Sequence, residues 1–268
     1  MAAQGGPTPP GDSAELLVAK ADGVLNVTFN RPEARNAMTW AMYEGLYDAC
    51  EQADNDPDVN VMVLRGSGAK SFVAGTDIGQ FTAFSSGADG IAYEAHITKI
   101  VNRLEGVNIP TLAVIRGYCV GGGLAIAAAC DLRIADDTAQ FGVPIARTLG
   151  NCLSANTLSL LVHHIGPART LDLLLRADFL TASAAHAAGF LAEVTTPPEL
   201  DERVTATVVR LLAHAPLTMW ASKELLRRMR RRLMVDDDDV VSAVFGSDDF
   251  AAAVRAFGDK TSHTWKGK

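Results

Sequence analysis

Two glycine-rich segments are the parts of this 268-residue chain whose residue types best suit chemistry. The first, FVAGTDI, covers residues 72–78, and the second, GYCVGGGLA, covers residues 117–125. Glycine lets a ligand atom come close to main-chain N–H groups, and the second segment opens an apolar helix whose N-terminal dipole favours negative charge. Two such N–H groups that converge on one oxygen would form an oxyanion hole. For either segment alone, a tight turn that packs for structural reasons is the alternative.

Other motifs do not point to chemistry of their own. The stretch GSGAKS at 66–71 resembles a phosphate-binding loop, but a Walker A motif needs Gly directly before the Lys, and Ala69 stands there. Apolar residues follow this stretch instead of a helix start, so a dinucleotide fingerprint also fails and a surface turn is favoured. The sequence contains no GxSxG or HExxH motif, which removes the commonest hydrolase and metalloprotease signatures.

Charge argues against nucleic acid or an anionic membrane as a partner. The 24 Lys and Arg residues against 31 Asp and Glu residues give a net charge of −7. Five arginines gather at 227–232, but four aspartates follow at 236–239, so the two fields largely cancel at a distance. A basic last turn and an acidic first turn match the dipoles of two successive helices, and this is the favoured interpretation.

The cysteines and the N-terminus indicate a cytoplasmic protein. Cys50, Cys119, Cys130 and Cys152 form no CxxC pair and no ligand-like spacing with His, so we expect reduced thiols and no metal site. Residues 1–13 are rich in Gly and Pro and lack the features of a secretory signal, which predicts a disordered leader. No run of 18 apolar residues occurs, so a membrane span is not expected.

The elements that must position the two segments alternate between strand and helix. Residues 15–19 and 24–29 are apolar runs separated by Ala-Asp-Gly at 21–23, which predicts a hairpin because Gly supplies the positive φ of a tight turn. Helix and strand patterns then follow in turn: a helix capped by Thr39 and running to about residue 53, a strand at 59–64, a helix at 91–104 and a strand at 111–115. This alternation predicts an α/β core.

The second half of the chain is expected to be mainly helical. Residues 124–130 are apolar and small on every face, which predicts a helix buried in the middle of the fold. From about residue 168 onward the pattern predicts an all-helical last third, with these helices: 168–176, 182–188, 199–213 and 217–231. We therefore divide the chain into a leader (1–13), an α/β core with the candidate site (14–197) and a helical C-terminal region (198–268).

Four motifs together resemble the crotonase superfamily, the enoyl-CoA hydratase/isomerase family. They are the two glycine-rich segments, NRPEARNAM at 30–38 and AQFGVP at 139–144, in the order and spacing of that family. The resemblance runs from about residue 15 to the end, where FGDK at 257–260 and Trp265 also fit. It implies a spiral of ββα units with a helical C-terminal region that forms trimers, often as a dimer of trimers (a hexamer).

The resemblance also implies a site for an acyl-coenzyme A thioester, with no separate cofactor and no metal. The backbone N–H groups of Thr76 and Gly122 would be the oxyanion donors. Residues 35–37 match the part of the family that lies along coenzyme A, and Arg31, Arg35 and Lys70 are candidates for pairing with its phosphates. The substrate-binding residues would be Arg35, Ala37, Lys70, Ala74, Gly75, Asp77, Ile78, Val120, Gly121, Ala125, Pro144 and Ile145.

The sequence departs from the family at its acid–base groups. Enoyl-CoA hydratases use two glutamates, and the matching positions here are Ala125 and Ile145, which cannot carry a proton. Asp77 is a possible replacement, although a structural role is favoured for it. Asp131 is expected to cap or tie the end of the buried helix, and His163 and His164 lie on a helical stretch where a surface or core histidine is the usual interpretation. His96 can also titrate near neutrality. Arg147, Asn151 and Cys152 lie near position 145 in the sequence and are the first places to look for a replacement.

The sequence thus predicts an enzyme that acts on an acyl-CoA through a thioester enolate with altered acid–base residues. Decarboxylation is one alternative, because loss of CO₂ from a malonyl-type thioester yields the enolate without any base. A protein that binds acyl-CoA and assembles without catalysis is the other.

Overall fold

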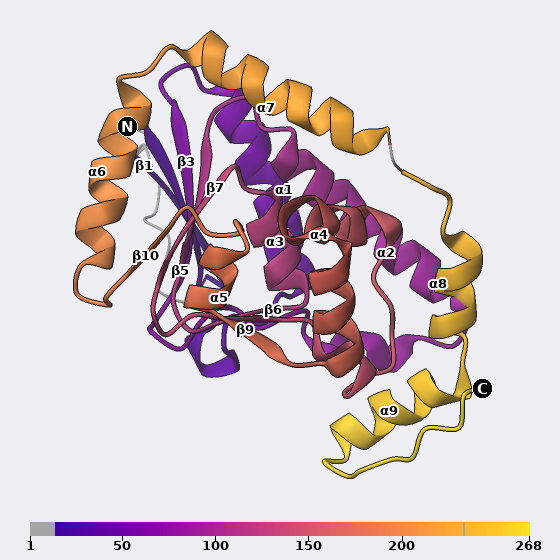
Figure 1. The fold of residues 1–268 in the computed structure, drawn as a ribbon. Helices are drawn as coiled ribbons and strands as arrows, with labels where there is room; N and C mark the ends of the chain where they lie inside the picture. Colours follow the sequence, from indigo (N-terminus) through magenta and orange to yellow (C-terminus); the bar gives the residue numbers. More distant parts are fainter. Residues whose placement is uncertain (1–13, 233) are drawn as a thin grey trace, which may run out of the picture.

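A mainly parallel sheet of six strands forms the centre of the computed structural model, which describes residues 14–232 and 234–268 (Figure 1). The predicted leader at 1–13 lies outside the described residues. The strand order is β1 (Leu16–Ala21), β2 (Val24–Phe29), β3 (Val61–Gly66), β5 (Thr111–Ile115), β7 (Leu132–Asp136) and β10 (Glu193–Thr195). The β1–β2 hairpin is confirmed, and its turn residues Asp22 and Gly23 both have positive φ.

Helices cover both faces of this sheet. Val61 and Val63 of β3 pack toward α6 (Leu200–Leu212), whereas the intervening side chains join the core under α1 (Trp40–Asn55), α2 (Gly87–Glu105) and α3 (Gly122–Ala129). Figure 1 shows α6 on one side of the sheet and the other three helices on the opposite side. Strands buried on both faces must be largely apolar, which explains the continuous apolar runs at 61–64 and 112–115.

Two predicted helix features are confirmed. The Thr39 side chain caps α1 by accepting the Met42 N–H at 3.3 Å. Residues 123–129 of α3 are all buried, as a helix that is apolar on every side requires.

A second, four-stranded sheet carries the two glycine-rich segments. Its order is β4 (Ser71–Val73), β6 (Tyr118–Val120), β8 (Gln140–Gly142) and β9 (Phe179–Thr181). Strands β4 and β6 are parallel neighbours, so their carboxyl ends lie side by side. Gly75 and Thr76 follow β4 after Ala74, and Gly121 and Gly122 follow β6 directly. The topology therefore brings together Thr76 and Gly122, which lie 46 positions apart in sequence.

The prediction of an all-helical last third was wrong. Strand β9 pairs antiparallel with β8, and β10 pairs parallel with β7. The predicted helix at 168–176 is the second half of α4 (Ala155–Arg176), which breaks at Gly166, where φ is 76°. The remaining helices are α5 (Ala182–Ala187), α7 (Pro216–Arg231), α8 (Asp238–Phe245) and α9 (Asp248–Gly258). Among the described residues, no helix has the length and apolar character that a membrane crossing needs.

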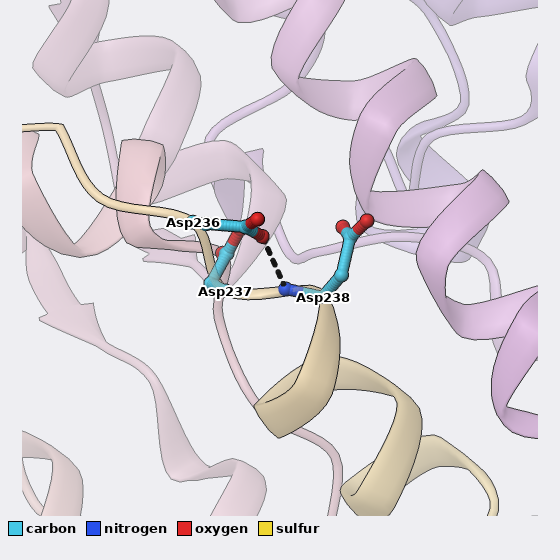
Figure 2. A group of neighbouring side chains, drawn as sticks. All are labelled: Asp236, Asp237 and Asp238. Carbon is cyan, nitrogen blue, oxygen red and sulfur yellow. Dashed lines mark hydrogen bonds between the residues drawn. The ribbon is translucent and has the colours of Figure 1, made fainter.

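The link between α7 and α8 confirms the predicted matching of helix ends. The last turn of α7 is basic and the first turn of α8 is acidic. Figure 2 shows Asp236, Asp237 and Asp238 at this start, where the Asp236 carboxylate accepts the Asp238 N–H at 3.2 Å. The Asp237 carboxylate accepts the N–H of Ala155 and so ties α8 to the first turn of α4.

Candidate active site

The two glycine-rich segments meet main chain to main chain. Gly75 has φ of 106° and Gly121 has φ of 54°, a region that side chains disfavour. A Cβ placed on Gly121 would lie 3.6 Å from the Gly75 Cα, and one on Gly122 would lie 3.8 Å from the Thr76 nitrogen. The glycines therefore allow both the turn and the close approach of the two backbones.

The N–H groups of Thr76 and Gly122 are available to a ligand. Within the described residues, neither of them donates a hydrogen bond to a protein acceptor. Gly122 is the first residue of α3, so its N–H is one of those that a helix leaves without an internal partner. Both residues line one cavity, and the N-terminus of α3 adds a favourable field for negative charge there. The arrangement can stabilise an oxygen atom on which negative charge develops.

A chain of three hydroxyl groups anchors the Thr76 segment. The Thr76 hydroxyl lies 2.8 Å from the hydroxyl of Tyr43 on α1 and 2.8 Å from that of Tyr93 on α2. Both tyrosines are buried, and burial raises the pKa of each phenol well above its usual range, so both stay protonated. The Tyr43 oxygen also lies only 2.5 Å from the place where a Cβ on Gly122 would be. Position 122 thus has no room for a side chain.

Replacing Thr76 with valine is expected to lower the free energy of unfolding by about 1–3 kcal/mol, because two buried phenols lose a hydrogen-bond partner. The valine is close to isosteric, and the backbone N–H stays in place. Urea unfolding of wild type, Thr76→Val and Thr76→Ser measures the effect. The serine variant keeps the hydroxyl and should lose less stability, whereas a valine variant as stable as wild type would contradict the bridging role.

An apolar cavity of about 190 Å³ opens beside the two N–H groups. Eight of the twelve residues predicted to bind substrate line it: Ala74, Gly75, Ile78, Val120, Gly121, Ala125, Pro144 and Ile145. Phe257 of α9 also lines the cavity. Helix α9 packs on the 3₁₀-helix η2 (Ile78–Ala83) through a contact between the rings of Phe250 and Phe81. The C-terminal helix therefore contributes Phe257 to the cavity wall of its own chain.

The other four predicted binding residues lie outside the cavity wall. Arg35 is exposed and stacks over the Tyr118 ring at 5.4 Å. Lys70 is exposed, and it forms no ion pair within the part of the chain that the structure describes. The Ala37 carbonyl accepts a hydrogen bond from Arg31 at 2.7 Å, so this residue helps to fix the loop.

Asp77 has a structural role in this loop. Its carboxylate pairs with Arg31 at 2.9 Å, and it caps η2 by accepting the Gly79 N–H at 3.1 Å. Arg31 also pairs with Glu15 at 3.2 Å. Two carboxylates thus occupy the Arg31 guanidinium, which makes it a poor candidate for a phosphate.

Most of the suggested acid–base residues are placed unfavourably. Asn151 lines the cavity, but Arg147 is exposed and outside it. Burial raises the pKa of the Cys152 thiol to about 12, so this thiol stays protonated near neutral pH. His96 pairs with Glu44 at 3.2 Å on the outer side of α2. Asp131 is held by Lys223 and by Thr111 at the start of β5.

His163 and His164 belong to a different and larger cavity of about 380 Å³ beneath α7. The His164 Nε2 lies 2.8 Å from the Ala128 carbonyl, and burial lowers the pKa of this imidazole to about 3. Arg230, which also lines this cavity, is paired with Glu105. The charges here are thus matched within the protein, and the larger cavity carries none of the features of the glycine-rich site.

Glu94 is the residue that the sequence analysis missed. It lies on α2, is only 7% exposed and lines the cavity shared by Thr76 and Gly122. Its Oε2 accepts the N–H of Ser154 at 3.1 Å, and burial raises the pKa of its carboxyl to about 7. A signal was present in the sequence, because Glu94 falls on the apolar stripe of its helix with Ile97 and Val101.

A comparison with protein families decides the relationship. Residues 19–268 match the family model of enoyl-CoA hydratase/isomerase. The chain belongs to this family. The resemblance seen in the four sequence motifs is thereby confirmed, as is the crotonase-like α/β fold.

Relatives in this family are enoyl-CoA hydratases. A probable enoyl-CoA hydratase of Mycobacterium bovis is 33% identical over 215 residues, which cover 80% of this chain and 81% of the relative. The 2,3-dehydroadipyl-CoA hydratase of Escherichia coli is 28% identical over 261 residues, covering 95% and 100%. The protein is therefore an enoyl-CoA hydratase/isomerase-like enzyme.

Solved structures of the family superpose over nearly the whole chain. An enoyl-CoA hydratase/carnithine racemase from Magnetospirillum magneticum has a TM-score of 0.77 at 29% identity, covering 95% of this chain and 96% of that one. A methylmalonyl-CoA decarboxylase complexed with 2S-carboxypropyl-CoA has a TM-score of 0.86 at 25% identity, covering 95% and 99%. The same fold thus occurs in proteins named for different reactions.

Proposed function

We propose that this family member binds an acyl-CoA thioester and stabilises its enolate with the N–H groups of Thr76 and Gly122. The observation that supports this most strongly is the pair of available N–H groups on residues that line one apolar cavity. Negative charge that grows on the thioester oxygen would be met by donors already in position. Removing one donor of this kind typically costs about 10²–10³ in turnover.

Coenzyme A would lie along the loop that contains Arg35, on the side of the molecule where β4 and β6 end. Arg35 and Lys70 are the exposed cations proposed to pair with its phosphates, because Arg31 is already held by two carboxylates. A local cationic surface is required, since the whole chain carries −7 and repels anions at a distance.

Decarboxylation is the second candidate reaction. Ala125 and Ile145 give the cavity an apolar wall where the resemblance places the hydratase glutamates, and an apolar wall disfavours the bound carboxylate relative to the enolate. The similarity to a methylmalonyl-CoA decarboxylase supports this reaction. A turnover screen with malonyl-type, 2-enoyl and 3-enoyl thioesters separates it from the main candidate, and binding without turnover would favour a non-catalytic acyl-CoA-binding protein.

Acyl-CoA is expected to bind and to raise the melting temperature, because a ligand that binds only the folded state stabilises it by mass action. At 100 times the dissociation constant the gain is about 2.7 kcal/mol. Titration calorimetry and thermal melts with several acyl-CoA esters measure this, with free coenzyme A as the weaker-binding control. The absence of both heat and a melting shift at millimolar ligand would remove the proposed function.

The chain is expected to form a trimer or a hexamer. Helices α6 and α7 expose large apolar side chains, among them Val209, Leu217, Leu225 and Met229, each at least 60% exposed. Such a surface is unusual for a monomer and favours burial between subunits. Light scattering at micromolar protein measures the mass, and a single species near 28.4 kDa would contradict the assembly.

A further inference from the structure

We propose that Glu94 is the proton-transfer group of this site and that it moves a proton between two carbons of a short 3-enoyl-CoA. The inference rests on the proposed function, because it assumes a thioester held by Thr76 and Gly122. It assigns the missing acid–base role to a different helix from the one that carries Ala125.

The position of Glu94 fits this role. Its neighbour Tyr93 is bonded through its hydroxyl to Thr76, so α2 brings Glu94 to the same cavity as the oxyanion donors. The N–H of Ser154 fixes one carboxyl oxygen, Oε2, at 3.1 Å. The Ser154 side chain also hydrogen-bonds to this carboxyl, and the Glu94 side chain forms part of the cavity wall, where it can meet a substrate.

A capping role alone is the competing explanation. Glu94 and Asp237 accept the N–H groups of Ser154 and Ala155, two successive residues at the start of α4. Carboxylates at a helix N-terminus are favourable in their own right. Only Glu94 also lines the cavity, however, whereas Asp237 reaches α4 from the start of α8. The two carboxylates therefore form a natural pair of test and control.

The chemistry needs one carboxylate and no other reactant. Glu94 takes the proton from the α carbon of a 3-enoyl thioester, the C–H electron pair forms the dienolate, and negative charge reaches the oxygen held by Thr76 and Gly122. The protonated Glu94 then returns the proton to the γ carbon, which leaves the conjugated 2-enoyl thioester and regenerates the carboxylate. Hydration, in contrast, has to activate a water molecule and also to protonate the α carbon.

The surroundings of Glu94 define the pH dependence. The charge of Asp237 acts on the pKa of Glu94, and the charge of Glu94 acts in turn on the pKa values of Tyr43, Tyr93 and Cys152. Burial raises the pKa of the two phenols and of the thiol, so these three stay neutral near pH 7, and Asp237 is the one charged neighbour of this set. Since the pKa of Glu94 is about 7, the carboxylate fraction and the rate should rise with pH and level off above neutrality.

The packed helices also carry charged groups without an ion pair among the described residues: Asp48 on α1, Asp89 and Lys99 on α2, and Asp238 and Asp239 on α8. None of these five lines the cavity, and none is among the causes of the raised Glu94 pKa. On α1 and α2, Glu44 pairs with His96, while Glu51 and Asp54 pair with Arg103. These pairs lie away from the cavity wall. The titration of the rate is therefore assigned to Glu94.

Conversion of 3-butenoyl-CoA to crotonyl-CoA tests the proposal, followed by the absorbance of the conjugated thioester. Glu94→Gln keeps an oxygen for the Ser154 N–H but cannot take a proton, so kcat should fall by about 10²–10⁴ with little change in KM. The small remaining rate should lose its dependence on pH near 7. Asp237→Asn, the control at the neighbouring N–H, should retain most of the wild-type plateau rate.

A second variant and a second measurement guard against misfolding. Glu94→Asp keeps the carboxyl but withdraws it by one methylene, and should give an intermediate rate, with a circular dichroism spectrum like that of wild type as the check on folding. Exchange of α-hydrogens for deuterium in D₂O, followed by NMR, detects proton transfer even without net conversion. Exchange should be present in wild type and lost in Glu94→Gln.

The results separate the two proposals. A folded Glu94→Gln variant with the wild-type rate would overturn the role of Glu94 and leave the enolate function intact. Binding of 3-butenoyl-CoA to wild type without conversion or exchange would also overturn it, while acyl-CoA binding would stand. Absence of any binding would remove both proposals.

Discussion

Hydration of crotonyl-CoA by the wild-type protein is expected to be slow or absent. Ala125 and Ile145 line the cavity at the positions where the resemblance places the two hydratase glutamates. Each general acid–base group typically contributes about 10²–10⁴, so losing both costs on the order of 10⁴–10⁸ and losing one costs about 10²–10⁴. Against a common enzyme median of about 10 s⁻¹, turnover should not exceed about 0.001 s⁻¹ with both groups lost, or about 0.1 s⁻¹ where Glu94 replaces one of them.

Loss of enoyl-thioester absorbance measures this hydration rate. The matched comparison is the variant that carries Ala125→Glu and Ile145→Glu together, which should hydrate faster than wild type if it folds. Wild-type turnover near 10 s⁻¹ would show that another group replaces the glutamates in full. Single substitutions of Glu94, Asp77 and Asn151 would then locate that group.

Gly122→Pro is expected to lower the rate of any enolate-forming reaction by about 10²–10³, because proline has no N–H to donate to the thioester oxygen. Proline is tolerated at the first position of a helix, and Gly122 holds that position in α3. Acyl-CoA binding should weaken less than turnover, since the donor acts most strongly when charge develops.

The control for Gly122→Pro must separate two effects: the loss of the N–H group and the clash of the added side chain. Any Cβ at position 122 would lie 2.5 Å from the Tyr43 hydroxyl oxygen. We therefore compare Gly122→Ala with Gly122→Pro, both in a Tyr43→Phe background that removes this oxygen. The alanine variant keeps the N–H and should retain far more activity. Equal rates for the two folded variants would refute the assignment of Gly122 as an oxyanion donor.

The sequence predicted the parts of the fold that depend on local patterns. The Asp22–Gly23 turn, the Thr39 cap and the buried helix α3 each follow from a few adjacent residues. Strands β9 and β10 were missed because each has only three residues, too few to show a period of two. Their pairing depends on β8 and β7, which lie far away in sequence, so no local pattern could have revealed it.

The site was predicted unevenly for a related reason. The glycine-rich segments carry their own signature, and the structure places Thr76 and Gly122 at one cavity. Arg31 and Asp77 are bound to each other, a contact between residues 46 positions apart that composition cannot reveal. Glu94 was overlooked because a glutamate in a helix is ordinary, and only the folded chain brings its apolar stripe to the cavity.

The three hydroxyls of Tyr43, Thr76 and Tyr93 have a consequence for how the site responds to charge. Three O–H protons are present, but only two hydrogen bonds join the three oxygens. Thr76 can donate to only one partner, so each arrangement leaves one proton over, on Tyr43, Thr76 or Tyr93. Moving between these arrangements rotates O–H bonds and displaces no heavy atom. Beside the fixed amide donors, the cluster is thus an adjustable dipole that a nearby anion can orient at little cost in structural rearrangement.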